Sequence, residues 1–206
     1  DALRALAAEI DDRHSGDVVT PYGEWGQWIN GGGWLTIQGR RVDWLYRDYA
    51  RVAHFVRECA EGRPTIHYQA GHPFGFTTAI YFGEVALTIP LTDPTGALAT
   101  LKTLTAPYPL PLKQALIRNL WEARFSLDTS AKSAQRGDVF HVTGGVFRAA
   151  SVMTQALFAL NERYWINEKG AVAMTANFPL VPRDYAHRVY ALLGAIGESP
   201  EQMQTV

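Results

Sequence analysis

The sequence has 206 residues, of which 47% are hydrophobic and 19% charged, and its formal net charge is −1. This composition is typical of a folded chain with enough volume for a core, and it excludes a disordered protein. The near-zero net charge, without a basic stripe among aromatic residues, argues against nucleic-acid binding. One cysteine excludes an internal disulfide, and polar side chains within the longest apolar run, 139–160, argue against a membrane span. We expect a cytoplasmic protein.

The first seventy residues predict a small α/β region. Helical spacing covers 1–13, a short strand follows at 18–19, and "PYGEWGQWINGGG" is typical of an irregular loop. "WLTIQ" and "RVDWLYR" are expected strands, and Gly39-Arg40 between them predicts a type II′ hairpin. Asp48 is expected to cap a helix that ends near Gly62. This thin sheet leaves an unpaired edge, through which the chain could form a homodimer.

After a short strand near residues 66–68, the sequence predicts helices only. The expected ranges are 76–88, 94–105, 111–135, 138–164, 168–176, 182–195 and 198–205. The predicted fold class is therefore α+β. Residues 1–70 form part of an α/β domain, and residues 71–206 form a helical-bundle domain.

Several common functional motifs are absent. The sequence has no GxGxxG, no GxxxxGK[ST] and no GxSxG, and its histidines lack zinc-ligand spacing. Asp43 is a carboxylate within the otherwise apolar run of a strand, where a charge is costly unless a partner meets it. An ion pair with Arg41 or Arg47 is one explanation, and a bound cation is the other.

A set of segments carries a family resemblance. "GRRVDWLYRD" at 39–48, "GHPFGF" at 71–76, "LWEARF" at 120–125 and "NEKGAV" at 167–172 together resemble a bacterial branch of the DNA polymerase β superfamily of nucleotidyltransferases. Aminoglycoside nucleotidyltransferases are the best-known relatives, and the resemblance covers nearly the whole chain. It implies transfer of a nucleoside monophosphate from an NTP to a hydroxyl of a small acceptor, for which an antibiotic-like amino sugar is one candidate.

The resemblance also implies a metal site. Family members hold two Mg²⁺ ions with three carboxylates, two from a D-x-D strand and a third from a neighbouring strand, and this third carboxylate is also the general base. Asp43 matches the third carboxylate.

The sequence departs from the family pattern in one respect. It contains no G-S dipeptide and no D-x-D pair, since the adjacent aspartates at 11–12 do not qualify, so the triphosphate-binding turn and two metal ligands are missing. We expect them outside this chain, as for the C-terminal part of a longer polypeptide, and we expect this chain alone not to catalyse. The alternatives are a non-catalytic nucleotide- or partner-binding module on a degenerate scaffold, and an accidental likeness.

Relatives also hold the NTP triphosphate with basic residues of the helical domain. Lys132 and Arg136 are candidates for this role, and for Lys132 the structural alternative is an i,i+4 pair with Asp128. Lys169 lies between expected helices where a ligand could reach it, or belongs to a solvated turn.

Two further residues and one loop are also candidates. Glu122 either holds a cationic acceptor or assists its hydroxyl, or it pairs with Arg118 on the same helix. Arg148 is expected to need a carboxylate partner within an apolar helix. The tryptophan-rich loop containing Trp25, Trp28 and Trp34 suits a flat polar or cationic ligand, or a cover over the core.

Overall fold

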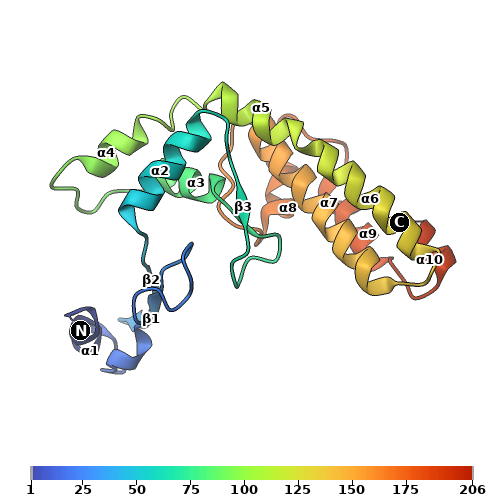
Figure 1. Cartoon of the computed structure of the whole chain (residues 1–206). Helices are drawn as coiled ribbons and strands as arrows, with labels where there is room; N and C mark the ends of the chain where they lie inside the picture. Colours follow the sequence, from blue (N-terminus) through green and yellow to red (C-terminus); the bar gives the residue numbers. More distant parts are fainter. Residues whose placement is uncertain (1, 206) are drawn as a thin grey trace. The chain divides into compact units, whose positions relative to one another are not determined.

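The computed structural model describes residues 2–205, and it is 52% helical and 8% strand (Figure 1). The predicted mixture of helices with small antiparallel sheets is confirmed. Two compact units share the chain: unit 1 comprises Asp1–Ala53 and Tyr68–Gly71, and unit 2 comprises His54–His67 and His72–Val206. The sequence placed a boundary near residue 70, whereas this division falls within helix α2 (Tyr49–Ala60) and assigns 68–71 to unit 1. No helix among the described residues has the length and apolar character needed to cross a bilayer.

Unit 1 is built on a hairpin packed against one helix. Helix α1 (Ala2–Ile10) and the short 3-10 helix η1 (Gly16–Val18) precede the antiparallel strands β1 (Gly32–Ile37) and β2 (Arg40–Leu45). Ala7, Val19 and Leu35 form its buried centre. The strand expected at 18–19 is wrong, because Val18 ends η1 and only Val19 forms an isolated bridge, to Gly33.

The hairpin turn lies one residue earlier than expected. Ile37 pairs with Arg40, so the two loop residues are Gln38 and Gly39, with φ of 51° and 73°. Positive φ at both positions is the type I′ pattern, which matches the twist of the strands, and the expected type II′ turn at Gly39-Arg40 is wrong. Strand β1 also starts earlier, at Gly32, where a Cβ would lie only 1.9 Å from the Trp44 carbonyl oxygen.

The region after the hairpin contains a second small sheet, of which the sequence predicted the first strand, near residues 66–68, but not the second. Asp48 caps helix α2 (Tyr49–Ala60) as expected, since its Oδ1 accepts from the Arg51 N–H at 2.7 Å. Strand β3 (Ile66–His67) pairs with β4 (Phe76–Thr77). The helix expected from residue 76 is therefore wrong at its start, and α3 begins at Ala79.

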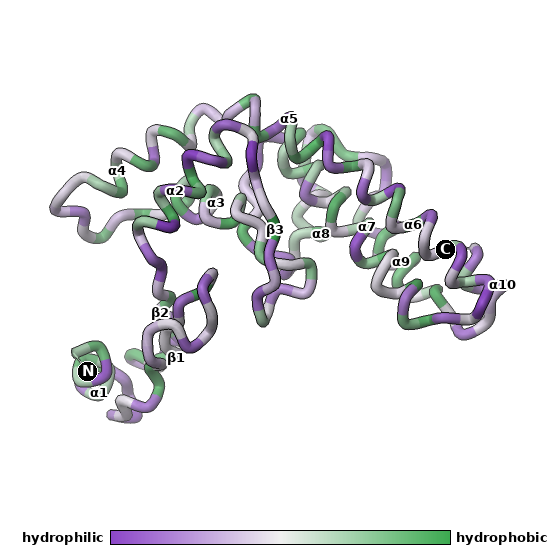
Figure 2. Tube along the Cα trace, in the orientation of Figure 1, coloured by the Kyte–Doolittle hydropathy of each residue, from purple (hydrophilic) through white to green (hydrophobic). Residues whose placement is uncertain are grey.

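Helices make up the rest of unit 2. They are α3 (Ala79–Leu87), α4 (Ala97–Lys102), α5 (Leu110–Arg118), α6 (Leu120–Ala134), α7 (Val139–Leu160), α8 (Ala171–Met174), η2 (Thr175–Asn177), α9 (Tyr185–Gly194) and α10 (Pro200–Gln204). The single helix expected over 111–135 is wrong, because the chain breaks at Asn119 into α5 and α6. Figure 2 shows that hydrophobic and hydrophilic stretches alternate along these helices.

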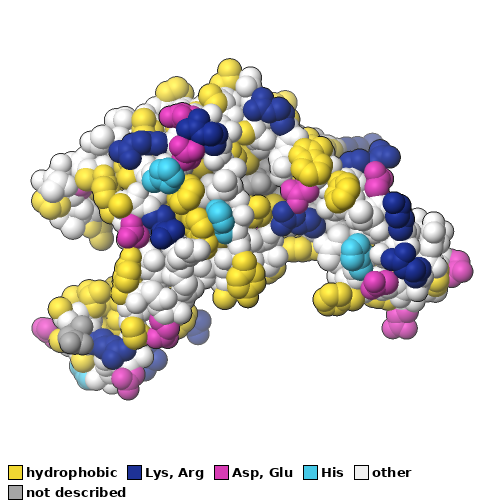
Figure 3. Space-filling view, viewed as in Figure 1, with side chains coloured by type: hydrophobic (Ala, Val, Ile, Leu, Met, Phe, Trp, Pro, Cys, Tyr) yellow, Lys and Arg dark blue, Asp and Glu magenta, His cyan; other side chains and the backbone are white. Residues whose placement is uncertain are grey.

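The antiparallel pair α6–α7 forms a large part of the unit 2 core. Asp138 begins α7 by accepting the His141 N–H at 3.0 Å. Gly145 permits close approach of the two helices, since a Cβ there would lie 1.8 Å from the Ser130 hydroxyl oxygen. The surface visible in Figure 3 mixes basic and acidic side chains, in keeping with the small net charge.

Candidate functional site

Asp43 lies on the outward face of the hairpin in unit 1. Residues alternate along β2, so Val42 and Trp44 pack toward the core while Asp43 is exposed. It stands opposite Trp34 and shares with it an open hollow of about 680 Å³, lined by Arg13, Trp34, Leu35, Thr36, Arg41 and Asp43. Within residues 2–205 the carboxylate forms no hydrogen bond or ion pair, so the pair expected with Arg41 or Arg47 is absent.

The expectation that Asp43 carries a desolvation cost is wrong. The carboxylate is solvent-exposed, so it needs no partner to offset desolvation. The carboxylate oxygens of Asp43 are therefore free to coordinate a cation or to accept a proton, because no other side chain of the described residues occupies them.

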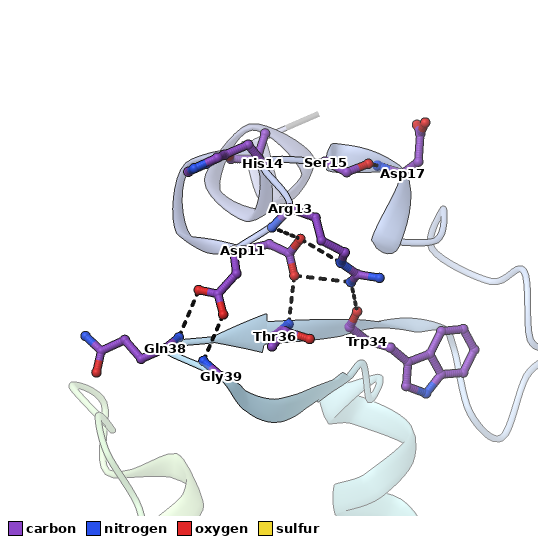
Figure 4. Close-up of polar contacts among 11 residues, drawn as sticks. Asp11, Arg13, His14, Ser15, Asp17, Trp34, Thr36, Gln38 and Gly39 are labelled. Atoms are coloured by element: carbon purple, nitrogen blue, oxygen red, sulfur yellow. Dashed lines mark hydrogen bonds and ion pairs between the residues drawn. The ribbon is translucent and has the colours of Figure 1, made fainter.

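Two aspartates to which the sequence assigned no role, Asp11 and Asp12, hold the β1–β2 hairpin. Asp11 has a fully buried side chain, and it accepts from the Thr36 N–H at 2.7 Å and from the Arg13 guanidinium at 3.1 and 3.2 Å (Figure 4). The hydrogen bond from Arg13, aided by that from Thr36, lowers the pKa of Asp11 to about 2. Asp12 accepts from the N–H groups of both turn residues, at 2.9 and 2.8 Å. These contacts fix the strand that pairs with Asp43.

The three tryptophans do not share one role: one covers the core, and the other two are accessible to a ligand. Trp28 is buried and belongs to the core, as the covering interpretation expected. Trp34 is 57% exposed and lies beside Trp25, with ring centroids 4.6 Å apart. Buried Gln69 fixes the loop by donating to the Trp25 carbonyl at 2.6 Å and accepting from the Ile29 N–H at 3.3 Å. The two rings are tilted by 33° to each other, so they form an angled aromatic surface, and Trp34 stands opposite Asp43 on the neighbouring strand.

In unit 2, Glu122 and Arg148 pair with each other. Arg148 Nε donates to Glu122 Oε1 at 2.5 Å, and the side chains are 32% and 20% exposed respectively. Asn119 donates to the other carboxylate oxygen at 3.0 Å. The alternative pair of Glu122 with Arg118 does not form, because the helix breaks between them and i,i+4 geometry is lost. The expected carboxylate partner of Arg148 is thereby confirmed, and its identity is Glu122.

The "GHPFGF" segment is held from two helical regions. Arg148 donates to the Phe74 carbonyl at 2.8 Å and lies 4.6 Å from the centre of the Phe74 ring. Glu168 accepts from the Phe74 N–H at 3.1 Å, and its other oxygen lies 3.1 Å from His72 Nδ1. Burial raises the pKa of Glu168, but the hydrogen bonds from His72 and the backbone outweigh it and hold that pKa below its usual value.

Two of the three expected phosphate-binding residues, Lys132 and Arg136, lie away from Glu122. Lys132 lies in the last turn of α6 and Arg136 lies two residues beyond its end, and at 1.5 Å per residue Lys132 is about 15 Å along the helix from Glu122. Both are exposed, and the expected pair of Lys132 with Asp128 is replaced by one between Arg124 and Asp128 at 2.9 Å. Lys169 is also exposed and follows Glu168 in a turn, with its N–H donating to the Asn167 side chain at 2.8 Å.

A pocket in unit 2 lies beside the Glu122–Arg148 pair. Its volume is about 320 Å³, and it is lined by Gly62, Pro64, Thr65, Ile66, Phe74, Thr77, Ala115, Leu116, Arg118, Asn119, Trp121, Glu122 and Gln155. All of these residues belong to unit 2.

The donor set for a metal ion is incomplete in this part of the chain. Residues 2–205 contain no group of three or more His, Cys, Asp or Glu side chains that could hold an ion together. Asp43 could supply one oxygen ligand, and a Mg²⁺ site would need further carboxylates from elsewhere. In the comparisons with known proteins, no family model, curated protein or solved structure matches the chain.

Proposed function

We propose that this chain is part of a Mg²⁺-dependent nucleotidyltransferase that transfers a nucleoside monophosphate from an NTP to a hydroxyl of a small molecule. The exposed, unpaired Asp43 carboxylate on a braced hairpin is the observation that carries the proposal. A base must be free to accept a proton and held where the acceptor can reach it. The exposure of Asp43 and the absence of a partner for it among the described residues support this role, and Trp34 stands opposite it on β1.

The proposed reaction is an in-line displacement at the α-phosphorus. The acceptor oxygen forms a bond to the α-phosphorus as the bond to the bridging oxygen of the β-phosphate breaks, so that pyrophosphate leaves. Asp43 accepts the proton of the acceptor hydroxyl. Bound Mg²⁺ would neutralise charge on the phosphates, and because residues 2–205 do not supply a full ligand set, its remaining carboxylates would come from outside this chain.

The test uses the natural polypeptide that contains this chain, together with its intact mass. It is incubated with Mg²⁺, each α-labelled NTP and a panel of hydroxyl acceptors that includes amino sugars, and adducts are identified by mass spectrometry. Asp43→Asn should lower the rate by about 10²-fold or more. Asp17→Asn is the matched control, because Asp17 is an exposed aspartate of unit 1 outside the hollow.

Two outcomes would reject the proposal. One is transfer at an unchanged rate in Asp43→Asn. The other is no adduct with any NTP from a polypeptide heavier than the 22.9 kDa of this chain.

A second candidate function is a non-catalytic binding module. It is favoured by the incomplete metal-ligand set of the described residues and by the unit 2 pocket, whose lining lies wholly within this chain. A measured mass of 22.9 kDa without NMP transfer, together with ligand binding in that pocket, would support it.

A further inference from the structure

The unit 2 pocket has the size of a small-molecule site. Its volume of about 320 Å³ lies at the lower end of the range for ligand pockets, roughly 300–1,000 Å³. Near the junction of α5 and α6, Figure 3 shows hydrophobic side chains beside acidic and basic ones. Such a mixture of apolar walls and a few polar groups is typical of pockets that bind and orient a small organic molecule.

Gln155 brings an unsatisfied amide to this pocket. It lies on α7, is only 4% exposed, and its Nε2 has no hydrogen-bond partner among the described residues. The nearby polar residues of α7 are not left unpaired, because the Ser151 and Thr154 hydroxyls donate to backbone carbonyls at 2.9 and 2.7 Å. Gln155 lines both this pocket and a small enclosed cavity beside Phe82 and Tyr108, and its Nε2 is closed to solvent. Buried amides in folded proteins nearly always have partners, so a ligand that reaches Gln155 would supply the missing one.

The pocket lining carries one acidic and one basic side chain, Glu122 and Arg118. Glu122 is already paired with Arg148, which lies outside the lining, so Arg118 is the charged lining residue left without an opposite charge. Within residues 2–205, Arg118 has neither an ion-pair nor a hydrogen-bond partner. A planar guanidinium of this kind matches a carboxylate or a phosphate, to which it can donate two parallel hydrogen bonds.

Aromatic side chains supply the apolar walls. Trp121 lines the pocket with 64% of its surface exposed, and Phe74 lines it from the segment held by Arg148 and Glu168. An exposed indole beside a rigid buried ring suits the flat face of a ligand. Arg148 holds Phe74 through both its carbonyl and its ring, so this wall is formed before any ligand binds.

We infer that this pocket binds a small flat organic anion, either an aromatic carboxylate or an aromatic phosphate. Arg118 pairs with the anionic group, the aromatic lining contacts the ring, and the Gln155 amide bonds a polar substituent on the ring. The inference goes beyond the proposed nucleotidyl transfer and does not depend on it, since all of these residues lie in unit 2 and no NTP or Mg²⁺ is involved.

The test compares benzoate, benzamide and benzamidine, which share one shape and carry charges of −1, 0 and +1. Phenyl phosphate is added to separate a phosphate preference from a carboxylate preference. Binding to the full chain is followed through the Trp121 indole N–H signal by NMR, assigned with Trp121→Phe. At about 10 mM, a range suited to fragments of this size, benzoate or phenyl phosphate should bind about tenfold more tightly than benzamide, and benzamidine should bind most weakly.

Variants assign the roles of the two polar residues. Arg118→Gln should remove the preference for the anion, Arg118→Lys should retain most of it, and Arg124→Gln, which alters an arginine 80% exposed on α6, should leave it unchanged. For Gln155, 4-hydroxybenzoate should bind more tightly than benzoate to the wild type and equally to Gln155→Leu. An unchanged backbone NMR spectrum shows that each variant is folded.

Tighter binding of benzamidine than of benzoate would overturn the inference and make Glu122 the recognition group. Absence of any Trp121 response to all probes would also overturn it. Neither result bears on NMP transfer, and loss of transfer in Asp43→Asn would not bear on the pocket.

Discussion

Replacing Arg148 with methionine removes three interactions while keeping the apolar stem of the side chain. These are the ion pair with Glu122 at 2.5 Å, the hydrogen bond to the Phe74 carbonyl at 2.8 Å, and the cation–π contact at 4.6 Å. Charge-assisted hydrogen bonds contribute about 1.5–3 kcal/mol each and a cation–π contact about 0.5–1 kcal/mol. Both charged groups are partly exposed, so we reduce the ion-pair contribution and expect the free energy of unfolding to fall by about 3 kcal/mol.

Urea denaturation followed by far-UV circular dichroism measures this loss, and thermal unfolding should show a midpoint lowered by about 6–12 °C. Amide exchange should also accelerate in the 72–76 segment, because Arg148 fixes it through Phe74. The matched control is Arg124→Met, since Arg124 forms an exposed pair with Asp128 at 2.9 Å and should cost only about 0.3–0.5 kcal/mol. Equal, small losses in the two variants would refute the reasoning that partial burial strengthens the Arg148 contacts.

Two further tests address packing and pH. Gly145→Ala should destabilise unit 2 by about 1–3 kcal/mol because the added Cβ would meet a serine hydroxyl at 1.8 Å. Gly144→Ala, with nothing within 4 Å, should instead stabilise by about 0.5–1 kcal/mol; chemical denaturation checks both, and equal effects would contradict the packing argument. Because the folded pKa of Asp11 is about 2 against an ordinary 3.8, its contribution to stability is present above about pH 4 and is lost as the pH falls toward 2. In the wild type, protection of the Thr36 amide from hydrogen exchange should fall as the pH is lowered from 5 to 2. The same pH dependence of protection in Asp11→Asn would contradict the role of the Asp11 carboxylate.

Local patterns explain which parts of the fold could be predicted. Asp48 could be predicted as a cap because its side chain bonds a backbone N–H only three residues away. The helix predicted over 138–164 includes the whole of α7, because the apolar spacing there is long and regular. The break at Asn119 was missed, since no glycine or proline marks it. Strand β4 was missed as well, because its two residues form a strand only by pairing with β3.

The candidate site shows the same division between local and distant contacts. Sequence spacing offered Arg118 as the partner of Glu122, yet the actual partner lies 26 residues along the chain on α7. Sequence spacing also dismissed the aspartates at 11 and 12 because they do not form a D-x-D pair, although they hold the hairpin that carries Asp43. A general signal for them existed, namely two adjacent acidic residues directly after the end of a helix.

The pairing of Glu122 with Arg148 changes the chemistry expected in unit 2. A free Glu122 would favour a cationic ligand such as an amino sugar, but both of its oxygens already accept hydrogen bonds. An amine would have to displace Arg148, which Phe74 also holds through its carbonyl and its ring. Since Arg118 then remains as the uncompensated charge of the described pocket lining, an acidic ligand is favoured over a basic one. The comparison of benzoate with benzamidine decides between these two charges directly.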